Sequence, residues 1–266
     1  MSHTKHSHAD HSHADHGHSH SHEYQYQSNS LGTQHTLEFV KPFTRPEATV
    51  LDVGCGTGEL AQLMSQNNLK VTAIDAHEKA VEKAKALGVD ARCIEFLQYQ
   101  NNSQFDLIVF SRSFHHIHPV EQTAKHAHEL LKDGGVLLLD EFGVELVDEK
   151  TACWFYGLKS VLQAANPERT AHGPKIEDGL LPVDPLANWR EHHVVKHEVA
   201  DSASMIAALK TYFEIKVEYR PYLYLYFLDL VNEEQAQRII EWENALCDAA
   251  ALARIGMRIV ARKKQS

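Results

Sequence analysis

The chain has 266 residues, of which 43% are hydrophobic and 23% are charged, and 26 lysines and arginines against 36 aspartates and glutamates give a formal net charge of −10. This length and apolar content can bury one large core, and the acidic balance without a basic stripe argues against nucleic acid as a partner. No apolar run approaches the roughly 18 residues of a membrane span, so we expect a soluble, cytoplasmic protein with no membrane partner.

Residues 1–30 are rich in histidine and are expected to form a disordered tail, because no Val, Ile, Leu or Phe lies between His3 and His22. Neutral imidazoles at many spacings can bind Zn²⁺ or Ni²⁺. The tail is therefore either a metal-binding segment or a low-complexity segment whose metal affinity is incidental. The candidate metal ligands are His3, His6, His8, His11, His13, His16, His18, His20 and His22.

From about Leu37, short apolar runs alternate with amphipathic helical patterns, which is typical of a parallel sheet covered by helices on both faces. The pattern predicts strands over 48–53, 70–74, 89–94, 105–110 and 136–139, with helices over 59–66, 78–87 and 120–131. This alternation predicts a doubly wound α/β fold.

The loop after the first predicted strand is rich in glycine and should approach a ligand closely. It reads V-L-D-V-G-C-G-T-G and places Gly54, Gly56 and Gly58 where the strand turns into a helix, whose first N–H groups face the loop. The dinucleotide fingerprint needs a third glycine where this chain has Glu59. The loop therefore predicts a nucleotide-like cofactor other than a dinucleotide.

Acidic residues around this loop indicate the chemistry of that cofactor. A pyrophosphate would meet the carboxylates of Asp52 and Glu59, whereas a cationic centre and an ammonium group suit them. Asp75, at the end of the second predicted strand, is placed to accept hydrogen bonds from both hydroxyls of a ribose.

On these residues the chain resembles the class I S-adenosylmethionine-dependent methyltransferases from about Thr49 to Phe142. The resemblance also covers the motifs A-I-D-A at 73–76, F-D-L-I-V-F at 105–110, L-L-K-D-G-G-V-L-L-L-D at 130–140 and, near the end, G-M-R-I-V-A-R-K at 256–263. It implies a mostly parallel, seven-stranded, Rossmann-like sheet whose last strand is antiparallel beside the fifth. It also implies S-adenosylmethionine as the cofactor.

Cofactor-binding residues follow from the same resemblance. The glycines would border the methionine part, the A-I-D-A motif would hold the ribose, the pair after the third strand would flank the adenine, and the residue after the fourth strand would lie near the methyl group. The residues concerned are Asp52, Gly54, Gly56, Gly58, Asp75, Ala76, Glu95, Phe96 and Ser111.

The segment after the fourth strand indicates the acceptor class. Amino-methylating enzymes of nucleic-acid bases carry [N/D]-P-P-[Y/F] there, whereas this chain reads S-R-S-F-H-H at 111–116. The pattern F-H-H-I resembles members that methylate small molecules, in which the second histidine is often structural. We therefore expect a small-molecule acceptor, a packing role for His116 and a candidate catalytic role for His115.

A long segment between the fifth and last strands implies a lid over the acceptor, at about 145–200 and 221–250 of a methyltransferase domain that spans 31–266. The sequence predicts helices over 148–166, 202–212 and 233–251, a loop over 172–185 and a sixth strand over 213–219. The tyrosines of the segment 221–230 would share one face if the segment is extended and would spread if it is helical. They would enclose the acceptor, stack on the sulfonium, or pack in the core.

Methyl transfer needs a general base only where the acceptor must lose a proton. Candidate bases lie in and near the predicted lid. They are His192, His193, His115 and Glu141. The histidine group at 192–197 has an alternative reading as a solvated face anchored by Trp189. The sequence thus predicts methyl transfer to a small molecule by in-line displacement. The alternative is a metal-handling protein with a His-rich tail and a cofactor-sensing fold.

Overall fold

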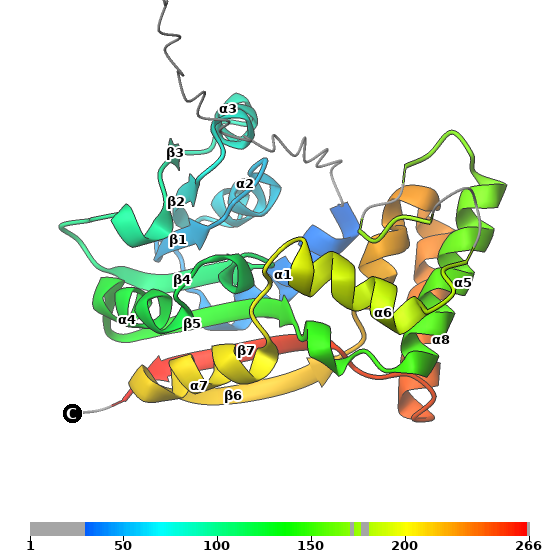
Figure 1. The fold of residues 1–266 in the computed structure, drawn as a ribbon. Helices are drawn as coiled ribbons and strands as arrows, with labels where there is room; N and C mark the ends of the chain where they lie inside the picture. The colour runs from blue at the N-terminus through cyan, green and yellow to red at the C-terminus, as the bar shows by residue number, and fades with distance from the viewer. Residues whose placement is uncertain (1–29, 171–172, 177–180, 265–266) are drawn as a thin grey trace, which may run out of the picture.

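The computed structural model describes residues 30–170, 173–176 and 181–264, and these form a seven-stranded sheet in the order β3-β2-β1-β4-β5-β7-β6 (Figure 1). The strands are β1 (Thr49–Val53), β2 (Lys70–Asp75), β3 (Ala91–Cys93), β4 (Phe105–Ser111), β5 (Leu131–Phe142), β6 (Phe213–Arg220) and β7 (Gly256–Lys263). β7 is antiparallel to both of its neighbours, and β1 to β5 are parallel. The doubly wound Rossmann-like sheet and the antiparallel last strand are therefore confirmed.

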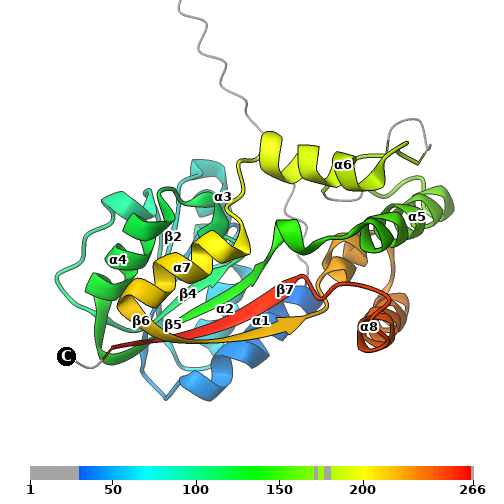
Figure 2. The ribbon, with the colours of Figure 1, turned by 60° about the horizontal axis from the view of Figure 1, so that its bottom comes forward.

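Helices cover both faces of the sheet because its central strands β1, β4 and β5 are buried and apolar on both sides. The helices beside the sheet are α1 (Ser30–Val40), α2 (Glu59–Gln66), α3 (Glu78–Ala86), α4 (Val120–Leu130) and α7 (Ser202–Tyr212). Val50 of β1 packs with α1 and α2, whereas its neighbour Leu51 packs with α4 and α7 on the opposite face (Figure 2). Short 3₁₀ turns complete this part of the chain: η1 (Lys41–Phe43), η2 (Phe96–Gln98), η3 (Phe114–His116) and η4 (Val144–Leu146).

Further helices build a second apolar core beyond the carboxyl end of β5 (Figures 1 and 2). They are α5 (Glu149–Ala165), α6 (Pro185–Arg190), the π-helical turn η6 (Glu191–Val195), the 3₁₀ helix η7 (Leu223–Leu230) and α8 (Glu233–Asp248). Phe155, Trp189 and Phe227 are fully buried at its centre. The carboxylate of Glu243 accepts hydrogen bonds from the backbone N–H groups of residues 222–224, at 2.7–2.8 Å, and so caps the start of η7.

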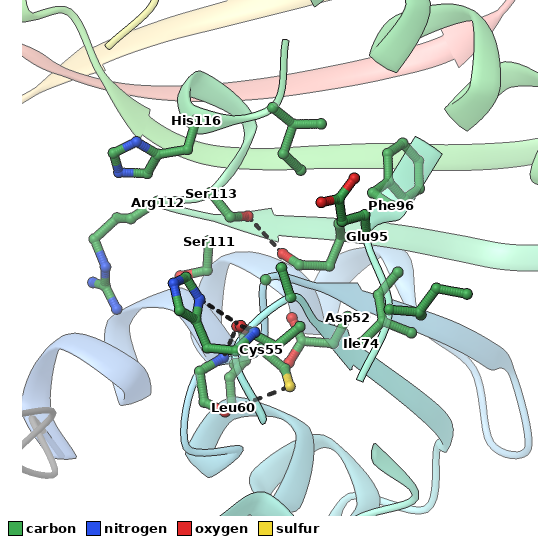
Figure 3. Close-up of a pocket in the computed structure, with 18 of the residues that line it drawn as sticks. Asp52, Cys55, Leu60, Ile74, Glu95, Phe96, Ser111, Arg112, Ser113 and His116 are labelled. Atoms are coloured by element: carbon green, nitrogen blue, oxygen red, sulfur yellow. Dashed lines mark hydrogen bonds and ion pairs between the residues drawn. The ribbon is translucent and has the colours of Figure 1, made fainter. Parts of the chain in front are cut away.

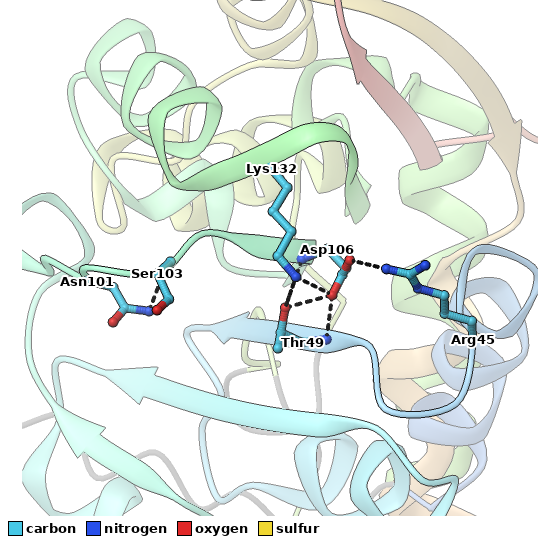
Figure 4. A network of polar contacts seen from close by, with 6 residues as sticks. All are labelled: Arg45, Thr49, Asn101, Ser103, Asp106 and Lys132. Carbon is cyan, nitrogen blue, oxygen red and sulfur yellow. Dashed lines mark hydrogen bonds and ion pairs between the residues drawn. The ribbon is translucent and has the colours of Figure 1, made fainter.

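Asp106 of β4 links the starts of the neighbouring strands β1 and β5 (Figure 4). It accepts hydrogen bonds from the backbone and hydroxyl of Thr49, from Lys132 and from Arg45, at 2.8–2.9 Å. Although burial opposes it, these donors hold the pKa of the Asp106 carboxyl well below its usual range. This network stabilises the edge of the sheet opposite to the one where β1, β2 and β4 end.

The structure adds a helix, α1, that the sequence did not predict, and it decides between the two alternatives for the segment 221–230. α1 begins at Ser30, before the first element that the sequence predicted. Residues 223–230 form a helix, so the aromatic rings of this segment point in different directions. Tyr222, just before the helix, stacks on Phe142, while the hydroxyl of Tyr226 is hydrogen-bonded to His193. The His-rich tail and part of the predicted loop lie outside the described residues. No helix of the described residues is long and apolar enough to cross a membrane.

Candidate functional site

A cavity of ≈ 560 Å³ lies where β1, β2 and β4 end, the edge at which open α/β sheets bind ligands (Figure 3). Eight of the nine predicted cofactor residues line it: Asp52, Gly54, Gly56, Asp75, Ala76, Glu95, Phe96 and Ser111. Gly58 does not line it. The lining also includes residues with no predicted role, namely Thr33 of α1, Cys55, His77, Arg112, Ser113 and His118, and it includes His116, for which the sequence predicted packing.

Glycines shape the loop between β1 and α2 by allowing close backbone approach. Gly54 has a φ of 70°, and a Cβ built there would lie 2.4 Å from the Cβ of Ser113. At Gly58, where φ is 88°, a Cβ would lie 2.6 Å from the Cβ of Ala84, so this glycine lets α2 pack on α3. Gly54 thus lets the loop lie directly against the turn that carries Ser113, and Gly58 has a packing role while its contact with the cofactor stays a prediction.

The carboxylate of Asp75 closes the glycine loop onto the end of β2. Its Oδ2 accepts a hydrogen bond from the N–H of Gly56 at 2.9 Å, and its Oδ1 accepts one from the N–H of His77 at 2.8 Å. One lone pair of Oδ2 is left for a ligand, because each carboxylate oxygen can accept two bonds. Asp75 is therefore held in a fixed position at the cavity wall.

Asp52 places a second carboxyl group in the wall, one that is incompletely paired. It is 1% exposed, and its Oδ2 has no hydrogen-bond partner in the described part of the chain. Burial, together with the negative charge of Asp75, raises the pKa of Asp52 to about 7. A buried carboxyl without a partner costs free energy, and a cationic or hydrogen-bonding ligand would remove that cost.

Residues predicted to flank an adenine occupy the cavity edge at η2. Phe96 is 4% exposed and packs edge-to-face on Phe110 with ring centroids 5.2 Å apart. Ile94 and Leu97 add apolar surface beside it. This edge is apolar enough to accept a flat heterocycle, while the side chain of Glu95 is exposed to solvent.

The turn after β4 is fixed by Glu141, a predicted general base. Its Oε1 accepts hydrogen bonds from the backbone N–H groups of Ser113 and Phe114 at 2.8 and 2.7 Å, and its Oε2 lies 2.5 Å from Nδ1 of His115. Both Glu141 and His115 are buried and neither lines the cavity. The pair holds the turn from behind the cavity wall, and a role as general base stays a prediction for both residues.

His116 faces the cavity where the sequence favoured His115. The turn η3 directs these adjacent side chains to different sides, so His116 lines the cavity and His115 is buried behind it. Partial desolvation at the cavity wall, with the neighbouring histidines, lowers the pKa of His116, although its side chain is exposed at the surface. Its imidazole is neutral at pH 7 and can accept or donate one hydrogen bond at the cavity wall.

The other predicted bases, His192 and His193, lie on η6 in the second core and do not line the cavity. His193 is 5% exposed, and its two ring nitrogens contact the carbonyl of Trp189 and the hydroxyl of Tyr226, both at 3.0 Å. Burial lowers the pKa of His192 to about 3 and that of His193 to about 4. Imidazoles this acidic are weak proton acceptors, so the geometry favours packing and orientation for both.

Metal binding finds no support in the part of the chain that the structure describes. No group of three or more His, Cys, Asp or Glu side chains there could hold a metal ion. The nine histidines from His3 to His22 lie outside that part, so metal binding by the tail stays a prediction.

Comparison with known proteins gives a family and several distant relatives. A family described as a methyltransferase domain matches residues 22–192. Among curated proteins, the chain is 28% identical over 137 residues to malonyl-[acyl-carrier protein] O-methyltransferase of Priestia megaterium, covering 49% of this chain and 50% of the relative. It is also 28% identical over 154 residues to the mitochondrial arginine-hydroxylase NDUFAF5 of Danio rerio, covering 56% and 45%. The chain thus spans about half the length of these curated relatives.

Solved structures show the same fold at low sequence identity. Phosphoethanolamine N-methyltransferase 2 of Haemonchus contortus, with phosphomonomethylethanolamine and S-adenosylhomocysteine bound, has a TM-score of 0.56 at 17% identity, covering 87% of this chain and 53% of that one. A SAM-dependent methyltransferase of Archaeoglobus fulgidus has a TM-score of 0.55 at 15% identity, covering 89% and 95%. At this identity the likeness concerns the fold alone.

Proposed function

Because this chain belongs to the class I S-adenosylmethionine-dependent methyltransferases, we propose that it transfers a methyl group from S-adenosylmethionine to a small-molecule acceptor. The observation that carries the proposal is the pair of carboxyl groups at the ends of β1 and β2. Asp75 is held by Gly56 with acceptor capacity left over, and Asp52 is buried with an unpaired oxygen. A ribose hydroxyl and a cationic group are the partners that such a pair accepts.

The cavity residues fit this cofactor in shape as well as in charge. Gly54, which a Cβ would push against Ser113, keeps the loop close to the turn after β4, and the apolar edge at Ile94 and Leu97 suits a purine ring. A dinucleotide fits less well, because its pyrophosphate would lie against the carboxyl groups of Asp52 and Glu59.

When bound, S-adenosylmethionine supplies a methyl group on a positively charged sulfur, which leaves readily in an in-line displacement. The task of this chain is then to hold the acceptor in line and to exclude water. Ser111, Arg112 and His116 form the cavity wall between the glycine loop and the second core, and we assign the orientation of the acceptor to them. We assign the role of the predicted lid to the second core, although no described residue of that core lines the cavity in this structure.

A base has a smaller part in this proposal than the sequence suggested. His116, His192 and His193 all have lowered pKa values, and Glu141 is engaged by three donors. An acceptor atom that is already nucleophilic, or that loses its proton to water, would need none of them. Positioning is thus the main contribution that we assign to the protein.

Calorimetry with S-adenosylmethionine, S-adenosylhomocysteine and NAD tests the cofactor assignment. We expect micromolar dissociation constants for the first two and no comparable binding of NAD. Incubation with methyl-labelled S-adenosylmethionine and a metabolite library then tests the reaction, and label must appear in a small-molecule product. The arginine-hydroxylase among the relatives makes this second step necessary, since cofactor binding alone does not define the chemistry.

A further inference from the structure

Arg112 is the only lysine or arginine among the described residues that line the cavity. It follows β4 directly and has a φ of 57°, in the left-handed region that non-glycine residues rarely adopt. Its N–H donates to the carbonyl of Asp140 at 2.9 Å, and Glu141 accepts from the two N–H groups that follow. A strained backbone held by this many bonds is typical of functional positions.

The guanidinium of Arg112 is uncommitted, in contrast to two other arginines nearby. Arg220 and Arg258 both pair with the buried carboxylate of Asp140. Among the described residues, the guanidinium of Arg112 has no hydrogen bond or ion pair, and no dashed line reaches it in Figure 3. Its N–H donors are therefore free to bind a ligand.

The position of Arg112 is not explained by a need to neutralise a carboxylate of the protein. Asp140 already has Arg220 and Arg258, and Asp52, although close enough to feel the positive charge of Arg112, forms no ion pair with it. The same charge also acts on Tyr222 and Tyr226 of the second core. Arg112 thus lies between the glycine loop and the second core, where a cofactor and an acceptor would meet.

We propose that the guanidinium of Arg112 binds a carboxylate of the ligands that fill this cavity. A planar guanidinium matches a carboxylate with two parallel hydrogen bonds, which fixes orientation as well as charge. The inference rests on the proposed function and extends it to a ligand class. The carboxylate has two sources: the amino-acid end of the cofactor, or an acidic acceptor.

Two binding experiments distinguish these sources, each with the wild-type protein, Arg112→Gln and a surface control, Arg238→Gln on α8. In the first, calorimetry compares S-adenosylhomocysteine with 5′-methylthioadenosine, which lacks the amino-acid end. If Arg112 binds the cofactor, Arg112→Gln raises the dissociation constant of S-adenosylhomocysteine by at least about tenfold and leaves that of 5′-methylthioadenosine unchanged.

In the second, each protein is saturated with S-adenosylhomocysteine and titrated with 4-fluorobenzoate or its neutral counterpart 4-fluorobenzamide, with fluorine NMR line widths as the readout. If Arg112 binds the acceptor, only the benzoate broadens, and only with the wild-type and Arg238→Gln proteins. If neither experiment separates Arg112→Gln from the wild type, the inference is wrong. A wild-type protein that binds no S-adenosylhomocysteine contradicts the proposed function instead, and the benzoate titration without cofactor still tests Arg112.

Discussion

Nδ1 of His115 lies 2.5 Å from Oε2 of Glu141, and both side chains are buried away from the cavity. The other oxygen of Glu141 holds the backbone of the turn after β4, which carries Arg112 and Ser113 to the cavity wall. The pair thus links buried His115 to the turn that forms the wall of the proposed acceptor site. We predict that this pair affects turnover only through the position of that turn.

Replacement of this carboxylate should therefore destabilise the fold. Glu141→Ala leaves two buried N–H groups and His115 without their acceptor, and we expect it to lower the free energy of unfolding by about 3–5 kcal/mol. Urea denaturation measures the change, with the exposed Glu121→Ala on α4 as control. Full stability combined with lost turnover would instead make Glu141 a proton acceptor.

Asp75→Asn should weaken S-adenosylmethionine binding by about 1–3 kcal/mol, because the amide cannot accept from a ribose hydroxyl as a carboxylate does. Calorimetry checks this, and the exposed Asp90→Asn at the start of the neighbouring strand is a matched control. An unchanged dissociation constant for Asp75→Asn would remove Asp75 from the cofactor site.

Cofactor affinity should depend on pH through Asp52. Its pKa of about 7 means that the free protein carries a neutral carboxyl at pH 6 and a carboxylate at pH 8. A cationic ligand binds the ionised form, so binding releases a proton below pH 7 and tightens as pH rises, by about tenfold between pH 6 and pH 8. Calorimetry in buffers of different ionisation enthalpy measures the proton, and Asp52→Asn should abolish the dependence. A flat profile in the wild type would place the cationic group elsewhere.

His192→Ala should lower turnover less than about tenfold, since an imidazole with a pKa of about 3 is a poor base at neutral pH. His193→Ala should mainly destabilise the second core, because it loses the contacts to Trp189 and Tyr226. Turnover and thermal unfolding of both variants separate the two effects. A loss of 10²–10⁴-fold in turnover with unchanged stability would restore the catalytic role that the sequence suggested.

Removal of residues 1–23 should abolish most Zn²⁺ or Ni²⁺ binding and leave S-adenosylmethionine affinity unchanged. The described residues contain no other cluster of side chains that could hold a metal ion, and the deletion removes all nine histidines from His3 to His22. Metal titration of the full-length and shortened proteins measures how many ions each binds. For the full-length protein this number should also decrease when the pH is lowered below the imidazole pKa of about 6.5. Equal stoichiometry in both proteins would contradict a metal-binding tail.

The fold and the acidic glycine loop could be predicted because their signals are local. Short apolar runs between polar segments predict the strands, and the spacing from Gly54 to Glu59 already argues against a dinucleotide. The residues beyond this loop could not be predicted in the same way. α1 is polar around Thr36, and its contacts are made by distant partners, such as the bond from the Thr36 hydroxyl to Asp140.

The acceptor side was harder still, because side-chain direction depends on backbone detail. Adjacent histidines in a 3₁₀ turn face different ways, so only the structure shows that His116 rather than His115 lines the cavity. The same holds for Arg112, whose left-handed backbone has no signal in its residue type. Both residues nevertheless lie in the short S-R-S-F-H-H segment that the sequence singled out.

The second core is assembled from two stretches of chain separated by α7 and β6. α5 and α6 precede these elements, while η7 and α8 follow them, and Phe155 of the first stretch packs on Phe227 of the second. The second core therefore cannot be exchanged between relatives as one insert. A change of acceptor that reshapes one stretch requires a matching change in the other, and the residues 22–192 that match the family contain only half of the pair.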